Sequence, residues 1–234
     1  MNRNGESRGI GNVYVTGGSS GLGAAVATAV VKAGGTAGVI DRVPPDADLP
    51  YSIADLADTG AAERAVADLV NRVGAPAAVV TAAGVDACGP LAEVDRESWD
   101  RVVQVNLLGT AAVVRACLPY LEQQRGTVVT VGSTLGLKAV SDATAYCASK
   151  FGIVGFTRAL AAELAGRVGV TMLVPGGMRT AFFDGRPEQY RPGPDAELMD
   201  PADVAEVVLT ALRQPAGCEL RELVVATLSE PSWP

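Results

Sequence analysis

A tyrosine and a lysine stand close together in the segment "TAYCASKFG", residues 144–152. Tyr146 precedes Lys150 by four positions, a separation that puts two side chains on one face of a helix. An isolated tyrosine, with a pKa of about 10, is a poor base at neutral pH, but a neighbouring cation favours the phenolate. The pair therefore suggests a phenol that moves a proton. The alternative is an amphipathic helix with a tyrosine at its edge and a solvated lysine.

The residue types that are missing narrow the possible chemistry. The chain contains no histidine, so acid–base catalysis has to use Tyr, Lys, Asp, Glu or Cys. The four cysteines are far apart and form no C-x-x-C pair, which is typical of reduced cysteines in a cytosolic protein and argues against a metal site. Cys147 has no histidine to activate it, and we expect it to fill space beside Tyr146.

A second group of residues is suited to binding a dinucleotide. The segment "TGGSSGLG", residues 16–23, places Gly17, Gly21 and Gly23 in a G-x-x-x-G-x-G spacing between a β-branched run and a helical pattern. Glycines let a backbone turn sharply beside a pyrophosphate, and the helix that follows offers free N–H groups. The alternative is a glycine-rich loop without a ligand.

Acidic residues further along could bind the adenosine half of such a cofactor. Asp41 ends the second β-branched run, 24 residues after Gly17, where a carboxylate accepts hydrogen bonds from ribose hydroxyls and repels a 2′-phosphate. This favours NAD, although the adjacent Arg42 leaves NADP possible. Asp55 and Leu56 could border the adenine, or could be part of an ordinary polar turn.

The elements that must position these residues follow a regular alternation. Because the apolar runs are continuous rather than alternating, we expect a parallel sheet covered on both faces. The order predicts a doubly wound α/β Rossmann fold, with a mostly or wholly parallel sheet of about seven strands and helices on both faces. The strand patterns cover 12–18, 36–42, 77–84, 126–133, 168–176 and 221–226, and the helical patterns cover 22–34, 60–74, 96–124, 144–165 and 201–214.

The chain shows no internal repeat or linker, so we expect a flexible segment over 1–10 and a single domain over 11–234. The region 177–200 is rich in proline, glycine and charge, and long loops in compact domains are usually functional. This loop could close over the cofactor. Its arginines Arg179, Arg186 and Arg191 could clamp an anionic group or could be surface charges.

Composition sets limits on partners and location. Nineteen Lys and Arg against 26 Asp and Glu give a formal charge of −7, which disfavours nucleic-acid binding as the main task. We expect no apolar run that approaches the roughly 20 residues of a membrane span, and the polar start "MNRNGESRG" has no apolar core of a secretion signal behind it. We expect a cytoplasmic protein with no membrane partner.

Several ordered motifs together resemble the short-chain dehydrogenase/reductase family in its shorter, single-domain form. The resemblance extends from about Gly11 to Ala226, and the spacings between Asn106, Ser133, Tyr146 and Lys150 agree with it. The motifs are "TGGSSGLG" (16–23), "AAG" (82–84), "VNLLG" (105–109), "VTVGS" (129–133), "YCASK" (146–150) and "PGGMRT" (175–180).

The resemblance implies a catalytic tetrad of Asn106, Ser133, Tyr146 and Lys150. Tyr146 would exchange a proton with the substrate, and Ser133 would hydrogen-bond the substrate oxygen. Lys150 would lower the pKa of Tyr146 and bind the nicotinamide ribose, while Asn106 would hold a water that relays protons to Lys150. Asparagine is unfavourable in the middle of a helix, and the water-holding role would explain its presence there. The alternative is that Asn106 simply marks a helix kink.

The resemblance also implies the residues of the cofactor site. The sequence departs from the family at Thr81 and Ala82, where the family often has two asparagines, and we expect a weaker tie between neighbouring strands there. The implied cofactor contacts are Gly17, Ser20, Gly21, Leu22, Gly23, Asp41, Arg42, Asp55, Leu56, Ala83, Gly84, Tyr146, Lys150, Pro175, Gly176, Met178 and Thr180.

The function that the resemblance implies is interconversion of a secondary alcohol and a ketone by hydride transfer with NAD or NADP. The substrate stays open among a polyol, cyclitol or sugar, a 3-hydroxyacyl compound, and a hydroxysteroid-like or secondary-metabolite ketone. A non-catalytic NAD(H)-binding regulator and a redox-neutral epimerase or dehydratase are further alternatives. By analogy with the family, a homodimer or homotetramer is expected, paired through the helices near 96–124 and 144–165.

Overall fold

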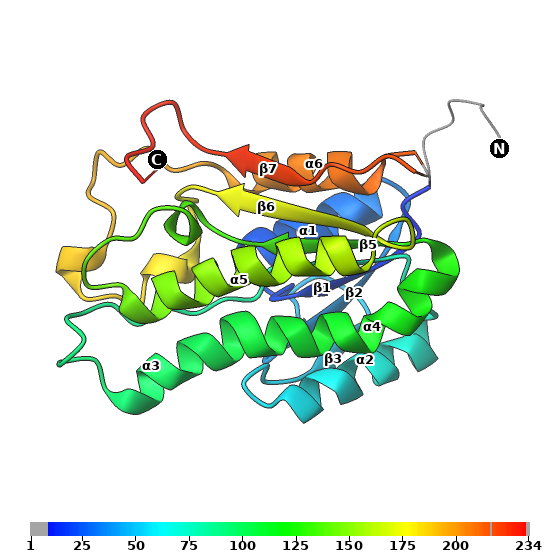
Figure 1. Ribbon diagram of the computed structural model, residues 1–234, viewed down its shortest axis with the longest axis horizontal. Coiled ribbons are helices and arrows are strands. Elements are labelled where there is room, and N and C mark those ends of the chain that lie inside the picture. Colours follow the sequence, from blue (N-terminus) through cyan, green and yellow to red (C-terminus); the bar gives the residue numbers. More distant parts are fainter. Residues whose placement is uncertain (1–8, 216, 233–234) are drawn as a thin grey trace.

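The structure is a computed structural model that describes residues 9–215 and 217–232 as one sheet covered by helices (Figure 1). Seven strands pair in the order β3-β2-β1-β4-β5-β6-β7, and every pairing is parallel. The predicted doubly wound α/β fold is therefore confirmed. The strands are β1 (Asn12–Thr16), β2 (Thr36–Asp41), β3 (Tyr51–Ile53), β4 (Ala78–Thr81), β5 (Thr127–Val131), β6 (Gly169–Pro175) and β7 (Glu222–Val225).

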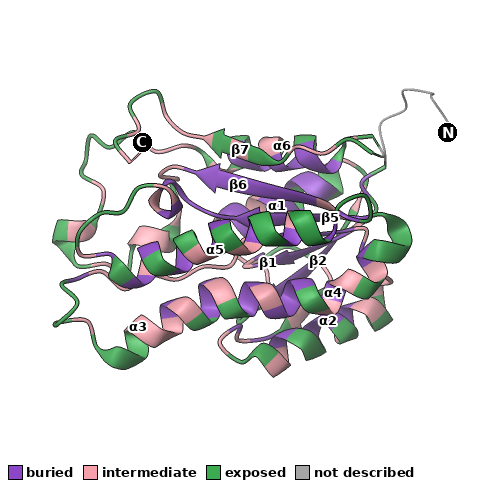
Figure 2. Ribbon diagram, in the orientation of Figure 1, coloured by how far each residue is buried: buried purple, intermediate pink, exposed green. Residues whose placement is uncertain are grey.

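Helices cover both faces of the sheet and create two cores (Figure 1). On one face lie α1 (Gly21–Lys32) and α6 (Pro201–Leu212), and on the other lie α2 (Thr59–Val73), α4 (Thr110–Gln124) and α5 (Thr144–Glu163). The central strands are buried along nearly their whole length (Figure 2). Burial on both sides explains their continuous apolar runs.

The chain reverses its direction of winding between β1 and β4, which are neighbours at the centre of the sheet. In a doubly wound sheet, the crevice for a ligand forms at the carboxyl ends of the strands at this reversal. The residues just past β1, β4 and β5 leave regular strand geometry there. Sequence patterns that extend to Gly84 and Ser133 therefore run past the ends of β4 and β5 and into the crevice.

The long helix predicted over 96–124 is interrupted. It consists of α3 (Arg96–Val103), a π-helical segment η1 (Gln104–Gly109) and α4. An extra residue per turn in such a segment changes the direction of the side chains, which periodicity alone does not reveal. By length and composition Arg96–Gln124 could cross a membrane, but half of its most apolar window is buried within the fold, as in a core helix.

The edge of the sheet and the start of the chain depart from the sequence expectations. The short strand β3 lies at the edge of the sheet with its side chains partly exposed, so its sequence carries no apolar pattern and its position was not predicted. The flexible segment expected over 1–10 falls mostly outside the described residues, and Ile10 is buried in the core.

Candidate active site

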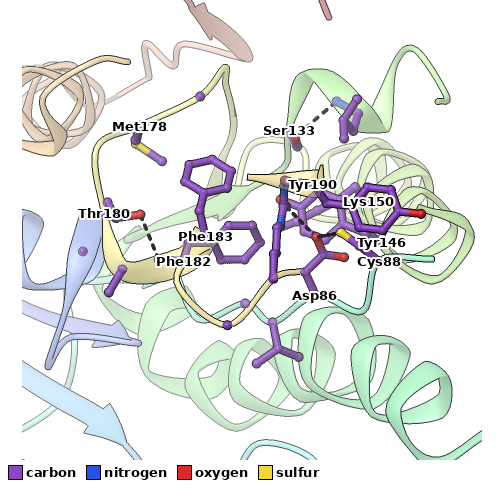
Figure 3. A pocket seen from close by; sticks show the side chains of 18 of the residues that line it. Asp86, Cys88, Ser133, Tyr146, Lys150, Met178, Thr180, Phe182, Phe183 and Tyr190 are labelled. Atoms are coloured by element: carbon purple, nitrogen blue, oxygen red, sulfur yellow. Dashed lines mark hydrogen bonds and ion pairs between the residues drawn. The ribbon is translucent and has the colours of Figure 1, made fainter. Parts of the chain in front are cut away.

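A cleft with a volume of about 1530 Å³ lies at the carboxyl ends of the strands. Its walls come from the glycine turn, the residues after β2, β4, β5 and β6, the start of α5, the loop 177–200 and the segment 227–232. Figure 3 shows the part of the cleft around Tyr146, with Ser133 and Lys150 nearby and Phe182 and Phe183 opposite. Every predicted site residue except Asn106 lines this cleft.

Tyr146 and Lys150 project from the first two turns of α5 into the cleft. The Lys150 side chain is buried, and its Nζ donates a hydrogen bond of 2.9 Å to the carbonyl oxygen of Val131 at the end of β5. The same Nζ lies 5.5 Å from the centroid of the Tyr146 ring. Their helical spacing therefore brings the phenol and the ammonium together.

Burial opposes ionisation of both groups. Burial raises the pKa of Tyr146 to about 12, an effect that the Ser133 side chain partly offsets. Burial lowers the pKa of Lys150 to about 8. In the chain without cofactor, burial is the largest influence on the pKa of Tyr146 and opposes formation of the phenolate. The expectation that Lys150 and an oxidised nicotinamide together lower this pKa stays a prediction. A positive charge brought by a bound oxidised nicotinamide would favour the phenolate of Tyr146.

Ser133 follows β5 and begins the short 3₁₀ helix η2 (Thr134–Gly136). Its Oγ accepts a hydrogen bond of 3.1 Å from the N–H of Leu135, and its hydroxyl is placed to donate to Tyr146, which lowers the pKa of the phenol. The side-chain rotation is thereby restricted, and the hydroxyl stays on the side of the cleft where Tyr146 lies (Figure 3).

Asn106 lies within η1 and is buried behind the cleft wall rather than in it. Its Oδ1 accepts from the N–H of Val85 at 2.8 Å, and its Nδ2 donates to the Val85 carbonyl at 2.9 Å and to Ser149 Oγ at 3.0 Å. The side chain thus joins η1, the segment after β4 and α5. This use of all its hydrogen-bonding groups gives Asn106 a structural role; its expected role in a proton relay stays a prediction.

The glycine turn has the shape that a pyrophosphate needs. A Cβ added to Gly17, whose φ is +67°, would lie 2.8 Å from the Cα of Ala83, and a Cβ on Gly23 would lie 2.1 Å from the Gly17 carbonyl oxygen. Ser20 begins α1 without a side-chain hydrogen bond to the helix, so the first N–H groups of α1 are left for an anion. These residues fit the diphosphate of a dinucleotide.

The two carboxylates expected to contact the adenosine both line the cleft. Asp41 accepts hydrogen bonds from the N–H of Ser19 at 3.0 Å and of Arg42 at 2.6 Å, which fixes it beside the glycine turn. Asp55 forms an ion pair of 2.8 Å with Arg101 and accepts from the N–H of Ala57. Arg101 was not predicted, because it is far from Asp55 in the sequence.

The loop 177–200 folds back on itself and covers the site. Its two ends are joined where the N–H of Met199 donates to the Gly177 carbonyl at 3.0 Å. Thr180 lies against Gly21 of the glycine turn, and the Phe182 ring is 5.6 Å from the Tyr146 ring (Figure 3). We call the part of the cleft around the glycine turn, Asp41 and Asp55 the candidate cofactor half. The part around Ser133, Tyr146 and Lys150 is the candidate catalytic half, and the loop contacts both parts.

The segment 227–232 forms part of the cleft wall, although no motif predicted it. Glu230 accepts a hydrogen bond of 3.2 Å from the N–H of Gly177, and Ser232 bonds the Thr134 hydroxyl at 2.6 Å.

The expected weak tie between strands at Thr81 is also visible, since its hydroxyl is one of two buried side-chain groups without a partner among the described residues. Thr16 ties the strands instead, by accepting from the N–H of Ala83.

Comparison with known proteins agrees with this geometry. Residues 11–191 match the family described as short chain dehydrogenase. The chain is 31% identical to 2-(S)-hydroxypropyl-CoM dehydrogenase 3 of Xanthobacter autotrophicus, over 88% of this chain and 90% of that protein. It is 32% identical to the 3-oxoacyl-[acyl-carrier-protein] reductase FabG of Thermotoga maritima, over 83% and 87%. A crystal structure of an actinorhodin polyketide ketoreductase variant with NADPH superposes with a TM-score of 0.81 at 28% identity, covering 92% of this chain and 95% of that one.

Proposed function

The chain belongs to the short-chain dehydrogenase family, and we propose that it is an NAD-dependent enzyme in which Tyr146 is the acid/base group. It is a nicotinamide-dependent oxidoreductase that acts on a secondary alcohol or the corresponding ketone. The observation that carries the catalytic assignment is the convergence of Tyr146, Lys150 and Ser133 at the base of one cleft whose far end is the glycine turn.

The proposed roles follow from the positions of the side chains. The bound nicotinamide supplies the hydride acceptor for oxidation and the donor for reduction. Ser133 donates a hydrogen bond to the substrate oxygen, and Tyr146 takes the hydroxyl proton as the carbon–hydrogen bond breaks. The pKa of Lys150 is about 8. At neutral pH the ammonium therefore keeps a positive charge beside the phenol and can still pass on a proton. In reduction Tyr146 returns the proton to the oxygen.

The preference for NAD rests on Asp41. Its carboxylate is held beside the glycine turn by two backbone N–H groups, where it favours ribose hydroxyls and repels a 2′-phosphate. Arg42 contributes its backbone N–H to this arrangement. In this proposal, Asp41 selects NAD in two ways: it attracts the ribose hydroxyls of NAD and repels the 2′-phosphate of NADP.

The test is a panel of secondary alcohols and ketones, each assayed with NAD(H) and with NADP(H) by the absorbance of the reduced nicotinamide. Turnover with a marked preference for NAD is expected. Tight NADH binding with no turnover on a broad panel would favour the non-catalytic regulator. Product formation without net change in NADH would favour the epimerase or dehydratase.

We also propose a homo-oligomer. Leu108 and Phe151, on η1 and α5, are 48% and 45% exposed, although both are large apolar side chains on the two helical segments expected to pair. Burying them against a second copy would remove apolar surface from water. Sedimentation velocity should show a dimer or tetramer, and a monomer at micromolar concentration would reject this proposal.

A further inference from the structure

One guanidinium lies in the catalytic half of the cleft, in the loop that covers Tyr146. Arg186 lines the cleft, and only 17% of its side chain is exposed. Its guanidinium carbon lies 5.1 Å from the centroid of the Phe182 ring and 4.7 Å from that of Phe183. Such a cation would be the natural clamp for a carboxylate, sulfonate or phosphate on a substrate.

Both terminal nitrogens of this guanidinium are already engaged by the protein, whereas its Nε is buried without a partner among the described residues. Arg186 Nη2 forms an ion pair of 2.5 Å with Asp86 Oδ2, and Nη1 donates to the Tyr190 carbonyl oxygen at 3.3 Å. Asp86 is more deeply buried than its partner, with 5% of its side chain exposed. The charges of Arg186 and Asp86 neutralise each other at a site from which water is largely excluded. A bound anion there would therefore lack a positive charge to balance its own.

Asp86 is fixed by further donors. Its Oδ1 accepts from the N–H of Ala87 at 2.7 Å, and its Oδ2 accepts from the Cys88 thiol at 3.1 Å (Figure 3). Burial, together with this hydrogen bond to Asp86, raises the pKa of the Cys88 thiol to about 12, so Cys88 stays a neutral donor. The carboxylate therefore stays beside Arg186 as a built part of the site.

The lining of the cleft as a whole carries more negative than positive charge. Among the described residues that line it, the cations are Arg42, Arg101, Lys150 and Arg186, and Arg101 is paired with Asp55. Carboxylates outnumber these cations and would slow the approach of an anion. Those carboxylates, besides Asp86, belong to Asp41, Asp55, Glu93, Asp95, Asp195, Glu197 and Glu230.

We propose that the catalytic half of the cleft selects uncharged secondary alcohols and ketones over anionic ones, and that Asp86 sets this preference by neutralising Arg186. The inference rests on the proposed function, because it concerns the substrate of the same site. It narrows the open substrate classes to molecules without a carboxylate, sulfonate or phosphate near the reacting carbon.

Asp86 and Arg186 are close enough to Tyr146 to influence its pKa. The charge of Asp86 raises the pKa of Tyr146, and the charge of Arg186 lowers it. With both present, the two effects oppose each other. Removal of either partner therefore changes the electrostatics at Tyr146 as well as in the substrate site, and in opposite senses for the two partners.

The test compares two substrates of nearly equal shape. 3-Hydroxybutyramide is neutral and 3-hydroxybutyrate is an anion, and both are oxidised at the same carbon, with the hydride passing to NAD and the hydroxyl proton to the enzyme. For the wild-type enzyme, kcat/KM for the amide should exceed that for the carboxylate by about tenfold or more. An equal or greater kcat/KM for the carboxylate would overturn the inference while leaving the proposed function intact.

Variants of the pair should move this ratio in opposite directions. Asp86→Asn leaves Arg186 cationic, so the amide-to-carboxylate ratio should fall by about tenfold. Arg186→Gln leaves Asp86 anionic, so the ratio should rise. The double variant should return it to within about threefold of the wild-type value. Ratios that shift in the same direction for both single variants would overturn the inference, because a purely structural defect would act in that way.

A surface variant and a binding measurement serve as controls. Asp184→Asn removes a negative charge from the same loop outside the cleft lining and should leave the ratio within about twofold. Circular dichroism and NADH binding show whether each variant is folded. If neither alcohol is turned over, calorimetry of acetoacetamide and acetoacetate with the enzyme–NADH complex gives the same comparison. Preferential binding of acetoacetate, or binding of neither ketone, would then reject the inference.

Discussion

At the scale of single residues, burial opposes ionisation of both Tyr146 and Lys150. Tyr146 is buried so that its pKa rises, and Lys150 is buried so that its pKa falls. In the proposed mechanism, the phenolate of Tyr146 is favoured by the charge of Lys150 and by that of a bound oxidised nicotinamide. Substitutions at single positions should separate proton transfer from cofactor binding.

Replacement of Tyr146 by Phe should remove the proton-transfer group and keep the ring that packs against Phe182. We expect kcat/KM to fall at least about a hundredfold, because general acid–base catalysis contributes that much or more. The Kd for NADH, measured by fluorescence, should change little. Activity above about one tenth of the wild-type value would defeat the assigned role.

The buried ammonium of Lys150 predicts a pH dependence of stability. Its pKa in the folded chain is about 8, below the ordinary 10.5, so the folded state binds fewer protons than the unfolded state between these values. The penalty for burying the charge is full below about pH 8 and disappears as the pH rises toward 10.5.

Urea unfolding at several pH values from about 7 to 10 measures this effect. The free energy of unfolding of the wild type, relative to Lys150→Met, should increase with pH over this range. Tyr146 titrates in the unfolded chain near its ordinary pKa of 10, and its pKa in the folded chain is about 12. The comparison with Lys150→Met cancels this contribution, because both proteins contain Tyr146. A difference that is flat with pH would show that Lys150 is not held with a lowered pKa.

Asp41→Ala tests the cofactor preference directly. Loss of the carboxylate removes acceptors for the ribose hydroxyls and the repulsion of a 2′-phosphate. The ratio of Kd for NADP to Kd for NAD should fall by about tenfold or more. An unchanged ratio would mean that another residue sets the preference.

At the scale of elements, the turn between β1 and α1 depends on close backbone contact. A Cβ on Gly23 would lie 2.1 Å from the Gly17 carbonyl oxygen. This clash could be relieved only by moving the backbone of the glycine turn. Loss of this packing should weaken both the fold and the cofactor site.

Gly23→Ala should therefore destabilise the protein by about 1–3 kcal/mol and weaken NADH binding. Gly193→Ala is the control, because a Cβ there meets no atom within 4 Å and the residue does not line the cleft. That substitution should be neutral or should stabilise the protein by up to about 1 kcal/mol. If the two variants behaved alike in urea unfolding and NADH titration, the close turn would have no special role.

At the scale of the whole molecule, the cofactor should act as a link between parts distant in sequence. The cleft brings together the glycine turn, the loop 177–200 and the segment 227–232, so a ligand that contacts all three stabilises the folded state. At a concentration of about one hundred times Kd, such a ligand contributes about 2.7 kcal/mol.

Thermal unfolding with and without cofactor measures this stabilisation without any substrate. We expect NADH at that excess to raise Tm by roughly 5–10 °C in a chain of this size, and NADPH at equal concentration to raise it less. Asp41→Ala should narrow the gap between the two. Equal shifts for both cofactors in the wild type would contradict the preference for NAD.

Much of the architecture was determined by the sequence itself. Continuous apolar runs predicted a parallel sheet buried on both sides, and the four-residue spacing put Tyr146 and Lys150 on one face of α5. The glycine spacing predicted the turn after β1. These features are local: they depend on residues a few positions apart, so backbone geometry and periodicity are enough to predict them.

Only the tertiary structure decided how the charges behave. Whether Lys150 lowers the pKa of Tyr146 depends on how much water each group loses, and burial is a property of the whole fold. The pairing of Arg186 with Asp86 joins residues 100 positions apart, and the segment 227–232 reaches the cleft without a motif of its own. The sequence therefore determined which groups could take part in the chemistry, whereas long-range packing decided which of them share an environment, because desolvation and pairing depend on neighbours that no local pattern identifies.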